Sequence, residues 1–249
     1  MLTIKSLSKS YHKKNVLDTI QLQFKIGEIN GVVGENGAGK TTLFKCIAGL
    51  ESYQGEVIHE NDNKKSTVGF LETNPQFLSK ITGKEYLQLL CNARNIKNVD
   101  FEAKNIFELP LKQYAETYST GMKKKLALTG VLLQENDILI LDEPTNDLDI
   151  ETLELLEEVV ANYAGTVILV SHDRDFVNNC VNTCLYFDGT GHINQIVGGY
   201  DDVEQYISRQ NESRKAFTQI TTESETVEKS ETKELKQVAK KKLSYKETR

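Results

Sequence analysis

The chain lacks any apolar stretch approaching the roughly eighteen residues that a membrane-spanning helix requires. Residues 1–5 do not form the apolar core of a signal peptide either. Cysteine is scarce, and the four that are present lack the spacing of a metal site or a disulfide framework; they are Cys46, Cys91, Cys180 and Cys184. The sequence therefore predicts a cytoplasmic protein with reduced thiols and argues against an integral membrane protein.

An excess of positive charge is also missing. The formal net charge of −6 argues against broad, nonspecific binding of nucleic acid by the body of the protein. The 249 residues are 39% hydrophobic, which is enough to bury one large core. We expect one domain over residues 1–205. Residues 206–249 are rich in Thr, Ser, Glu and Lys and predict a charged tail, either disordered or a helix that awaits a partner.

A phosphate-binding loop is the clearest motif in the chain. Residues 34–41 fit the pattern G-x-x-x-x-G-K-[ST], with a strand-like run at 30–33 before them and a helical pattern at 43–48 after them. Glycines let backbone N–H groups turn around phosphate oxygens, and the helix adds the positive end of its dipole. Lys40 would contact the β- and γ-phosphates, and the Thr41 hydroxyl would bind Mg²⁺. The predicted nucleotide-binding residues of the loop are Gly34, Glu35, Asn36, Gly37, Ala38, Gly39, Lys40, Thr41 and Thr42.

Two acidic residues follow a second apolar run. Residues 138–141 read as a buried parallel strand, and Asp142 and Glu143 stand at its carboxyl end, where ligands bind in open α/β sheets. Successive side chains of a strand point to opposite faces, so we expect Asp142 to bind Mg²⁺ and Glu143 to polarise the attacking water. The alternative is a solvated acidic pair. The loop and the acidic pair together predict a protein that binds and hydrolyses a nucleoside triphosphate with Mg²⁺.

A histidine follows a third apolar run. Residues 166–170 read as a strand, and His172 lies just beyond it at the same predicted sheet edge as Asp142. This placement predicts a sensor of the γ-phosphate, with a structural histidine as the alternative.

The order of these motifs resembles that of ABC-type ATPases over residues 1–205. The matching segments are the phosphate-binding loop, Tyr118–Met122, Leu141–Pro144, Asn146–Asp149 and Ser171–Asp173. The resemblance implies an α/β P-loop NTPase fold with a mainly parallel core sheet, a small antiparallel β layer and a helical subdomain at about 83–135. It also implies ATP and Mg²⁺ as ligands, and a head-to-tail homo- or heterodimer of cassettes.

In such a dimer, the resemblance implies that Ser119 and Gly121 of one cassette close on the γ-phosphate held by the other. Ser119 is a good helix N-cap, and Gly121 allows close backbone approach. Thr120 and Met122 depart from the usual Leu-Ser-Gly-Gly-Gln pattern. Tyr11 resembles the aromatic residue that stacks on the base. No glutamine stands where the family has its coupling glutamine, and Glu72 is our candidate for that position as an added metal ligand.

The two halves of the chain resemble different branches of the family. Residues 1–140 resemble the ATP-binding subunit of a bacterial exporter, whereas residues 142–249 resemble the C-terminal part of ABC-F proteins, which act at ribosomes or on nucleic acid. The first hypothesis is the energy-coupling subunit of an ABC transporter, bound to membrane-spanning subunits at the inner face of the membrane. The second is an ABC-F-like ATPase that binds the ribosome or RNA. The third is an ATPase coupled to nothing.

Overall fold

The structure is a computed structural model that describes residues 1–61 and 64–212. The chain divides into two compact units, Met1–Val203 and Glu204–Arg249. Of the second unit, residues 204–212 are helical, and most of the tail predicted at 206–249 lies outside the described residues. The predicted boundary at residue 205 stays a prediction. None of the described helices has both the length and the apolar character of a membrane span.

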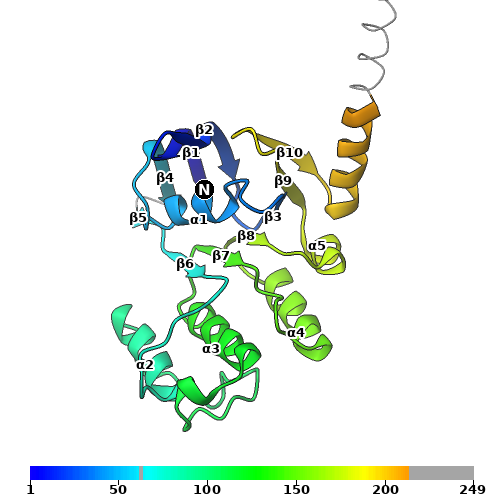
Figure 1. Cartoon of the computed structure of the whole chain (residues 1–249). Coiled ribbons are helices and arrows are strands. Elements are labelled where there is room, and N and C mark those ends of the chain that lie inside the picture. Colours follow the sequence, from blue (N-terminus) through cyan, green and yellow to red (C-terminus); the bar gives the residue numbers. More distant parts are fainter. Residues whose placement is uncertain (62–63, 213–249) are drawn as a thin grey trace, which may run out of the picture. The chain divides into compact units, whose positions relative to one another are not determined.

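The strands of the first unit form two sheets among the described residues (Figure 1). The smaller sheet has the order β2-β1-β4-β5 and is antiparallel, and its strands are β1 (Leu2–Tyr11), β2 (Lys14–Phe24), β4 (Gln54–Asn61) and β5 (Lys64–Lys65). The larger sheet has the order β10-β9-β3-β8-β7-β6 and is parallel except for β10. Its strands are β3 (Ile29–Gly34), β6 (Val68–Leu71), β7 (Ile138–Asp142), β8 (Thr166–Val170), β9 (Thr183–Phe187) and β10 (Ile193–Val197). The predicted fold, a mainly parallel sheet with a small antiparallel layer, is confirmed.

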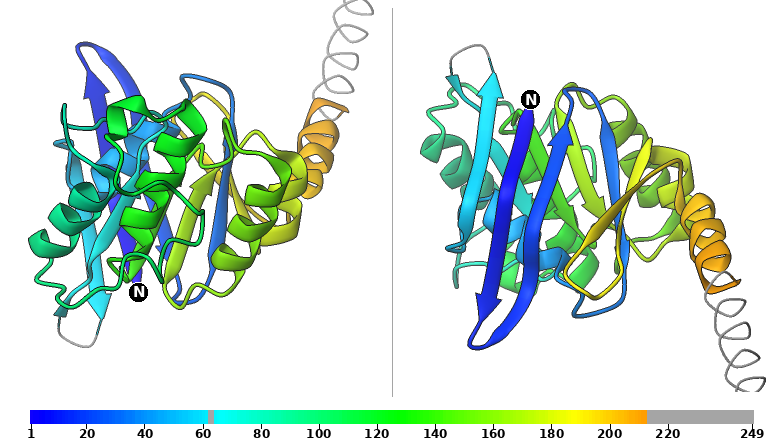
Figure 2. Two further views of the ribbon diagram at one scale, coloured as in Figure 1. Left: turned by 90° about the horizontal axis from the view of Figure 1, so that it is seen from below. Right: turned by 90° about the horizontal axis from the view of Figure 1, so that it is seen from above.

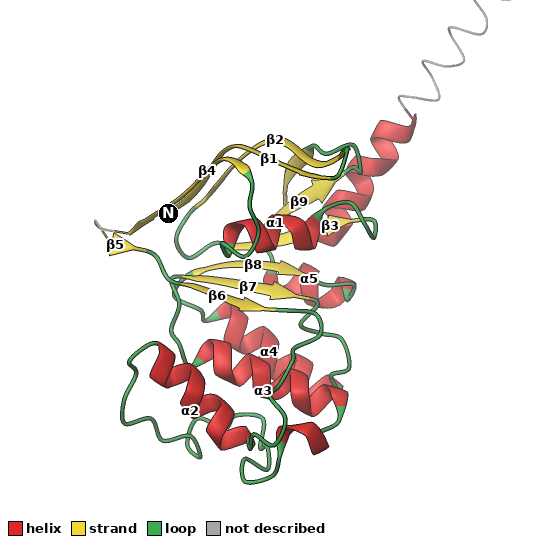
Figure 3. Ribbon diagram, turned by 60° about the vertical axis from the view of Figure 1, so that its left-hand side comes forward, coloured by secondary structure: helices red, strands yellow, loops and turns green. Residues whose placement is uncertain are grey.

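Helices cover both faces of the larger sheet. Figure 3 shows α1 (Lys40–Ile47) between the two sheets, and α3 (Thr120–Leu132) and α4 (Ile150–Ala161) on the opposite face of the larger sheet. Figure 2 shows the antiparallel strands side by side in one view and the helical segment, with α2 (Gly83–Ala93), in the other. The short helix α5 (Arg174–Cys180) connects β8 to β9. The main core surrounds α1 between the two sheets, and it almost completely buries Phe24, Phe44 and Ile140.

The helical subdomain is less helical than the sequence suggests. Between α2 and α3 the chain is irregular apart from the 3₁₀ turn Ala115–Thr117. Asn95 and Asn98 adopt left-handed φ values of 57° and 58°, which asparagine tolerates better than most residues, and Pro110 cannot donate a helical hydrogen bond. The range expected to be a helical subdomain, about 83–135, is therefore irregular in its middle.

A hairpin and four buried cysteines complete the description of this unit. β9 and β10 form the hairpin, with Ile193 opposite Phe187 and a turn that contains Gly189 and Gly191. All four cysteines are free and buried, as expected for reduced thiols. Burial raises the pKa of the Cys180 and Cys184 thiols to about 12, so both stay protonated at neutral pH.

Replacement of Ile140 tests whether β7 anchors the core. Ile140 is completely buried in β7, and we expect Ile140→Ala to lower the free energy of unfolding by about 2–5 kcal/mol because it leaves a cavity. The control is Ile150→Ala, which removes the same atoms from a side chain that is 75% exposed and should cost less than about 0.5 kcal/mol. Urea unfolding measures both, and equal losses would contradict this account of the core.

Candidate functional site

The predicted phosphate-binding loop connects β3 to α1. Gly39 is the N-cap of α1 and has a left-handed φ of 108°. A Cβ atom at Gly39 would lie 3.1 Å from side-chain atoms of Val16 and Leu17, so both the backbone conformation and the space favour glycine there. The free N–H groups of the first turn of α1 therefore begin at this loop, as an anion site requires.

Lys40 lies across its own loop. Its ammonium group donates hydrogen bonds to the carbonyl oxygens of Gly34 at 2.7 Å and Glu35 at 3.0 Å, and the residue is 8% exposed. Burial lowers the pKa of Lys40, and the charges of Glu143 and Asp142 oppose that shift. Gly34 and Glu35 thus orient the lysine through their backbones, and Ala38 packs against the core.

Thr41 and Asp142 meet at the carboxyl edge of the sheet. The Thr41 hydroxyl donates to Asp142 Oδ2 at 2.9 Å across 101 positions of sequence. Asp142 is the last residue of β7, and Thr41 is the second residue of α1. The sequence prediction that these two side chains share a site is consistent with this geometry.

Glu143 points to a different partner. Its Oε1 lies 3.1 Å from His172 Nε2, while its Oε2 is buried without a hydrogen-bond partner among the described residues. Burial raises the pKa of the Glu143 carboxyl, and the nearby His172 opposes the rise. The expected alternation along a strand is not the reason that the two acids diverge. β7 ends at Asp142, and Glu143 has a left-handed φ of 53°, which redirects its side chain.

His172 follows β8 and is held by its neighbours. Ser171 Oγ lies 2.7 Å from Thr145 Oγ1 and accepts a hydrogen bond from the Asp173 backbone N–H at 2.9 Å. The His172 side chain itself is 62% exposed, which leaves it free to contact a ligand.

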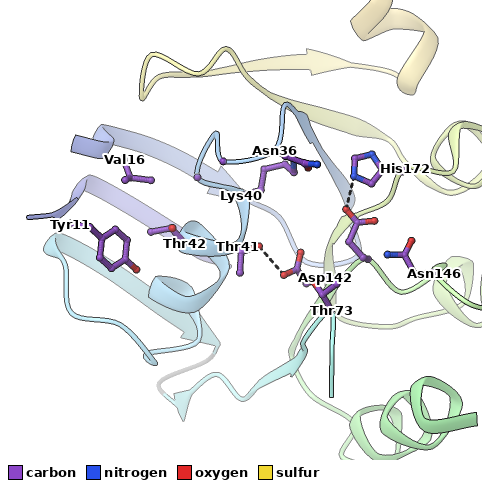
Figure 4. Close-up of a pocket in the computed structure, with 13 residues that line it drawn as sticks. Tyr11, Val16, Asn36, Lys40, Thr41, Thr42, Thr73, Asp142, Asn146 and His172 are labelled. Atoms are coloured by element: carbon purple, nitrogen blue, oxygen red, sulfur yellow. Dashed lines mark hydrogen bonds and ion pairs between the residues drawn. The ribbon is translucent and has the colours of Figure 1, made fainter. Parts of the chain in front are cut away.

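These side chains line one cleft of about 580 Å³ (Figure 4). Tyr11 and Val16 lie at the end of the cleft away from His172. Most of the predicted residues line it, and the complete lining is Tyr11, Val16, Asn36, Gly37, Gly39, Lys40, Thr41, Thr42, Thr73, Asp142, Glu143, Asn146 and His172. The cleft combines cationic, acidic and N–H groups at one end with an aromatic ring at the other.

Thr73 occupies the wall that we assigned to Glu72. Thr73 lines the cleft, whereas the Glu72 side chain is exposed and lies outside the lining. Lys124 of α3, which is 2% exposed, donates a hydrogen bond to the Thr73 carbonyl oxygen and a longer one, 3.4 Å, to that of Glu72. The geometry gives no support to Glu72 as a metal ligand, and its role stays a prediction.

Ser119 and Gly121 do not line this cleft. Ser119 is the N-cap of α3 and accepts a hydrogen bond from the Met122 backbone N–H at 3.2 Å. A Cβ atom at Gly121 would lie 2.5 Å from the Asp147 carbonyl oxygen, so glycine permits close contact between α3 and the segment after β7.

Sequence reasoning assigned no role to three of the lining residues, Val16, Thr73 and Asn146. Asn146 carried a signal, because it lies in the matching segment after Glu143. Thr73 stands beside the candidate Glu72, and the choice between them depended on how the backbone turns. Val16 carried no signal, since one valine in an alternating strand does not reveal which cleft it borders.

Comparison with protein families and curated proteins identifies relatives. A family model described as ABC transporter matches residues 17–146, slightly more than half of the chain. The ATP-binding protein Uup of Escherichia coli is 35% identical over 237 residues, which are 88% of this chain and 36% of that protein. The energy-dependent translational throttle protein EttA of Haemophilus influenzae is 28% identical over 224 residues, 83% of this chain and 38% of that protein. The chain thus spans little more than a third of the length of these relatives.

Solved structures share the fold. The ATP-binding subunit of an ABC transporter has a TM-score of 0.69 and 23% identity, and the match covers 84% of this chain and 93% of that one. A dimeric, post-hydrolysis ATP-binding cassette with ADP and Pi has a TM-score of 0.66 and 21% identity, with coverage of 79% and 98%. At these identities the likeness establishes the fold alone.

Replacement of Lys40 tests the phosphate end of the cleft. We expect Lys40→Ala to weaken ATP binding by roughly tenfold to a hundredfold or more, because charge-assisted hydrogen bonds to the phosphates are lost. Isothermal titration calorimetry measures the change. Lys84→Ala, on the exposed side of α2, is the control and should bind ATP like the unchanged protein. Unaltered ATP affinity in Lys40→Ala would show that the phosphates bind elsewhere.

Proposed function

Because this chain belongs to the ABC transporter family of ATP-binding cassettes, we propose that it is an ABC-F-like ATPase that acts at the ribosome. ATP binds in the cleft with its triphosphate on the loop before α1, and the cycle of binding and hydrolysis drives the association with the partner.

One observation carries the ATPase part of the proposal. Lys40, the Thr41–Asp142 pair and the Glu143–His172 pair converge on a single cleft at the carboxyl edge of the sheet. Phosphoryl transfer to water needs a group that contacts the phosphates, a pair of oxygen ligands for the metal, and a base. Their convergence from α1, β7 and β8 gives each part a fixed position.

The Thr41–Asp142 pair suits Mg²⁺. A hydroxyl and a carboxylate within 2.9 Å are the kind of oxygen ligands that this ion takes when most of its shell comes from phosphates and water. No cluster of three or more His, Cys, Asp or Glu side chains within the described residues would hold a metal by itself. Bound there, Mg²⁺ supplies positive charge to the β- and γ-phosphates.

Glu143 acts as the base that aligns water. Its burial raises the carboxyl pKa, which makes the carboxylate a better proton acceptor than an exposed one. His172 contacts one of its oxygens, and the second oxygen is buried without a hydrogen-bond partner among the described residues, so the carboxylate is not fully satisfied. His172, exposed beside this pair, contacts the γ-phosphate.

A second cassette completes the site. Ser119 and Gly121 lie at the start of α3, outside the cleft of their own chain, so their helix N-terminus is free to meet the γ-phosphate held by another cassette. The fold is shared with a cassette that is dimeric with ADP and Pi bound.

The choice of a ribosomal partner follows from the relatives. EttA carries the name of a translational throttle, and residues 142–249 resemble ABC-F proteins. The sequence alone favoured a transporter subunit, and the resemblance of residues 1–140 to an exporter subunit keeps that function as the second candidate. The curated relative EttA, by its name, favours the ribosomal one.

Replacement of the base tests the mechanism. We expect Glu143→Gln to bind ATP, to hydrolyse it at least about a hundredfold more slowly, and to accumulate as an ATP-bound dimer. Phosphate release and size-exclusion chromatography with ATP measure these effects. Glu154→Gln, an exposed position on α4, is the matched control and should hydrolyse ATP normally. Undiminished hydrolysis in Glu143→Gln would exclude Glu143 as the base.

The same variant distinguishes the possible partners. We expect the Glu143→Gln protein to co-sediment with ribosomes from its own cells when ATP is present, and to leave them when ATP is replaced by ADP. Lys40→Ala should not co-sediment under either condition. Co-purification with a membrane protein would support the transporter function instead. If the protein co-purifies with neither ribosomes nor a membrane protein, both functions are contradicted.

A further inference from the structure

Tyr11 lies at the rim of the cleft, and residues outside the cleft contact its ring. Tyr11 is the last residue of β1, is 39% exposed and lines the cleft together with Val16 of β2. An exposed aromatic ring is a good stacking surface when it is already held in one orientation. Ordering a mobile side chain on binding costs conformational entropy and weakens the affinity.

Lys9 holds one face of the Tyr11 ring. Its ammonium nitrogen lies 4.8 Å from the ring centroid, within the range of a cation–π contact. The same nitrogen lies 2.9 Å from Glu51 Oε2 and donates to the Ser52 carbonyl oxygen at 2.6 Å. Lys9 is only 8% exposed, so this cation is fixed below the ring.

Glu51 completes the cluster from a distant part of the chain. The hydrogen bond from Lys9 is the main cause that lowers the pKa of the Glu51 carboxyl. The Glu51 hydrogen bond in turn raises the pKa of Lys9, so the cation persists at neutral pH. Glu51 thus holds Lys9, and Lys9 in turn lies over one face of the Tyr11 ring.

The arrangement leaves one face of the ring for a ligand. Neither Lys9 nor Glu51 lines the cleft, whereas Tyr11 and Val16 do. Lys9 thus contacts one face of the ring without lining the cleft. Tyr11 and Val16 both lie at the end of the cleft opposite His172, where the other ring face is left for a ligand (Figure 4).

We propose that Lys9 and Glu51 are positioning residues for the base of the nucleotide, which act by fixing the Tyr11 ring as a stacking platform. The inference rests on the proposed binding of ATP in this cleft, but not on hydrolysis or on a ribosomal partner. A cation that lies over the ring and is itself fixed by Glu51 keeps the platform ordered before the nucleotide arrives.

The experiment compares two ligands that share a triphosphate. We expect Lys9→Met to weaken MgATP binding about threefold to tenfold and to leave binding of magnesium tripolyphosphate unchanged, as measured by calorimetry. Lys5→Met, an exposed lysine of the same strand, is the control and should alter neither affinity. Equal weakening of both ligands by Lys9→Met would overturn the proposal, because it would indicate general damage to the fold.

A double-mutant cycle tests whether Lys9 acts through Tyr11. In a Tyr11→Ala background, Lys9→Met should have no further effect on the ATP affinity, whereas additive losses would overturn the proposal. Glu51→Gln provides the same test if Lys9→Met does not fold, and Lys9→Arg should retain most of the ATP affinity. If the unchanged protein binds MgATP no more tightly than magnesium tripolyphosphate, the base contributes no affinity. The inference then fails, although the proposed phosphate site stands. If it binds neither ligand, the proposed function itself fails.

Discussion

The parallel alignment of β3, β8 and β7 is the constraint on which the cleft depends. These adjacent strands all end at the same edge, so the loop before α1, Ser171–Asp173 and Asp142 emerge side by side although they are far apart in sequence. The pairing of Asp142 with Val170 fixes the register at that edge. A shift of the strand register by one residue would turn Asp142 toward the opposite face and break its contact with Thr41. The register that buries the apolar strand residues is therefore the same register that places the site.

The second requirement is that the buried charges of the site compensate one another. One buried lysine lies near two buried acids of opposite charge. Lys40, Asp142 and Glu143 are all less than a tenth exposed, and each would be costly to bury alone. Lys40 is bound to two carbonyl oxygens and lies in the field of both acids, and Asp142 accepts from Thr41. Glu143 is the least satisfied of the three, since one of its oxygens has no partner among the described residues and its backbone is in a left-handed conformation. Such a residue is expected at a site of chemistry rather than in a purely structural network.

The sequence predicted which residues meet around the loop before α1, because that part of the cleft is coded locally. A loop between strand and helix, and acids at the end of an apolar run, carry their geometry within a few residues. Contacts between distant segments were not predictable in this way. Lys124 meets Thr73 across 51 positions, and Lys9 meets Glu51 across 42, and no local pattern identifies either pair. The strands β4 and β6 were missed for a related reason, since their residues are recognised as strands mainly through the partners beside them.

The cleft therefore has two ends of different origin. The end that we propose for the base belongs to the antiparallel layer, through Tyr11 and Val16, whereas the end that we propose for the phosphates belongs to the edge of the parallel sheet. A third connection leads away from the phosphates: Thr73 lines the cleft, its carbonyl is bound by the buried Lys124, and Lys124 lies in the same helix that Ser119 caps. A shift of Thr73 toward a γ-phosphate would pull on α3 through a hydrogen bond that is shielded from water and hence costly to break. The helix whose N-cap we expect to meet a second cassette is thus in hydrogen-bonded contact with the wall of the cleft.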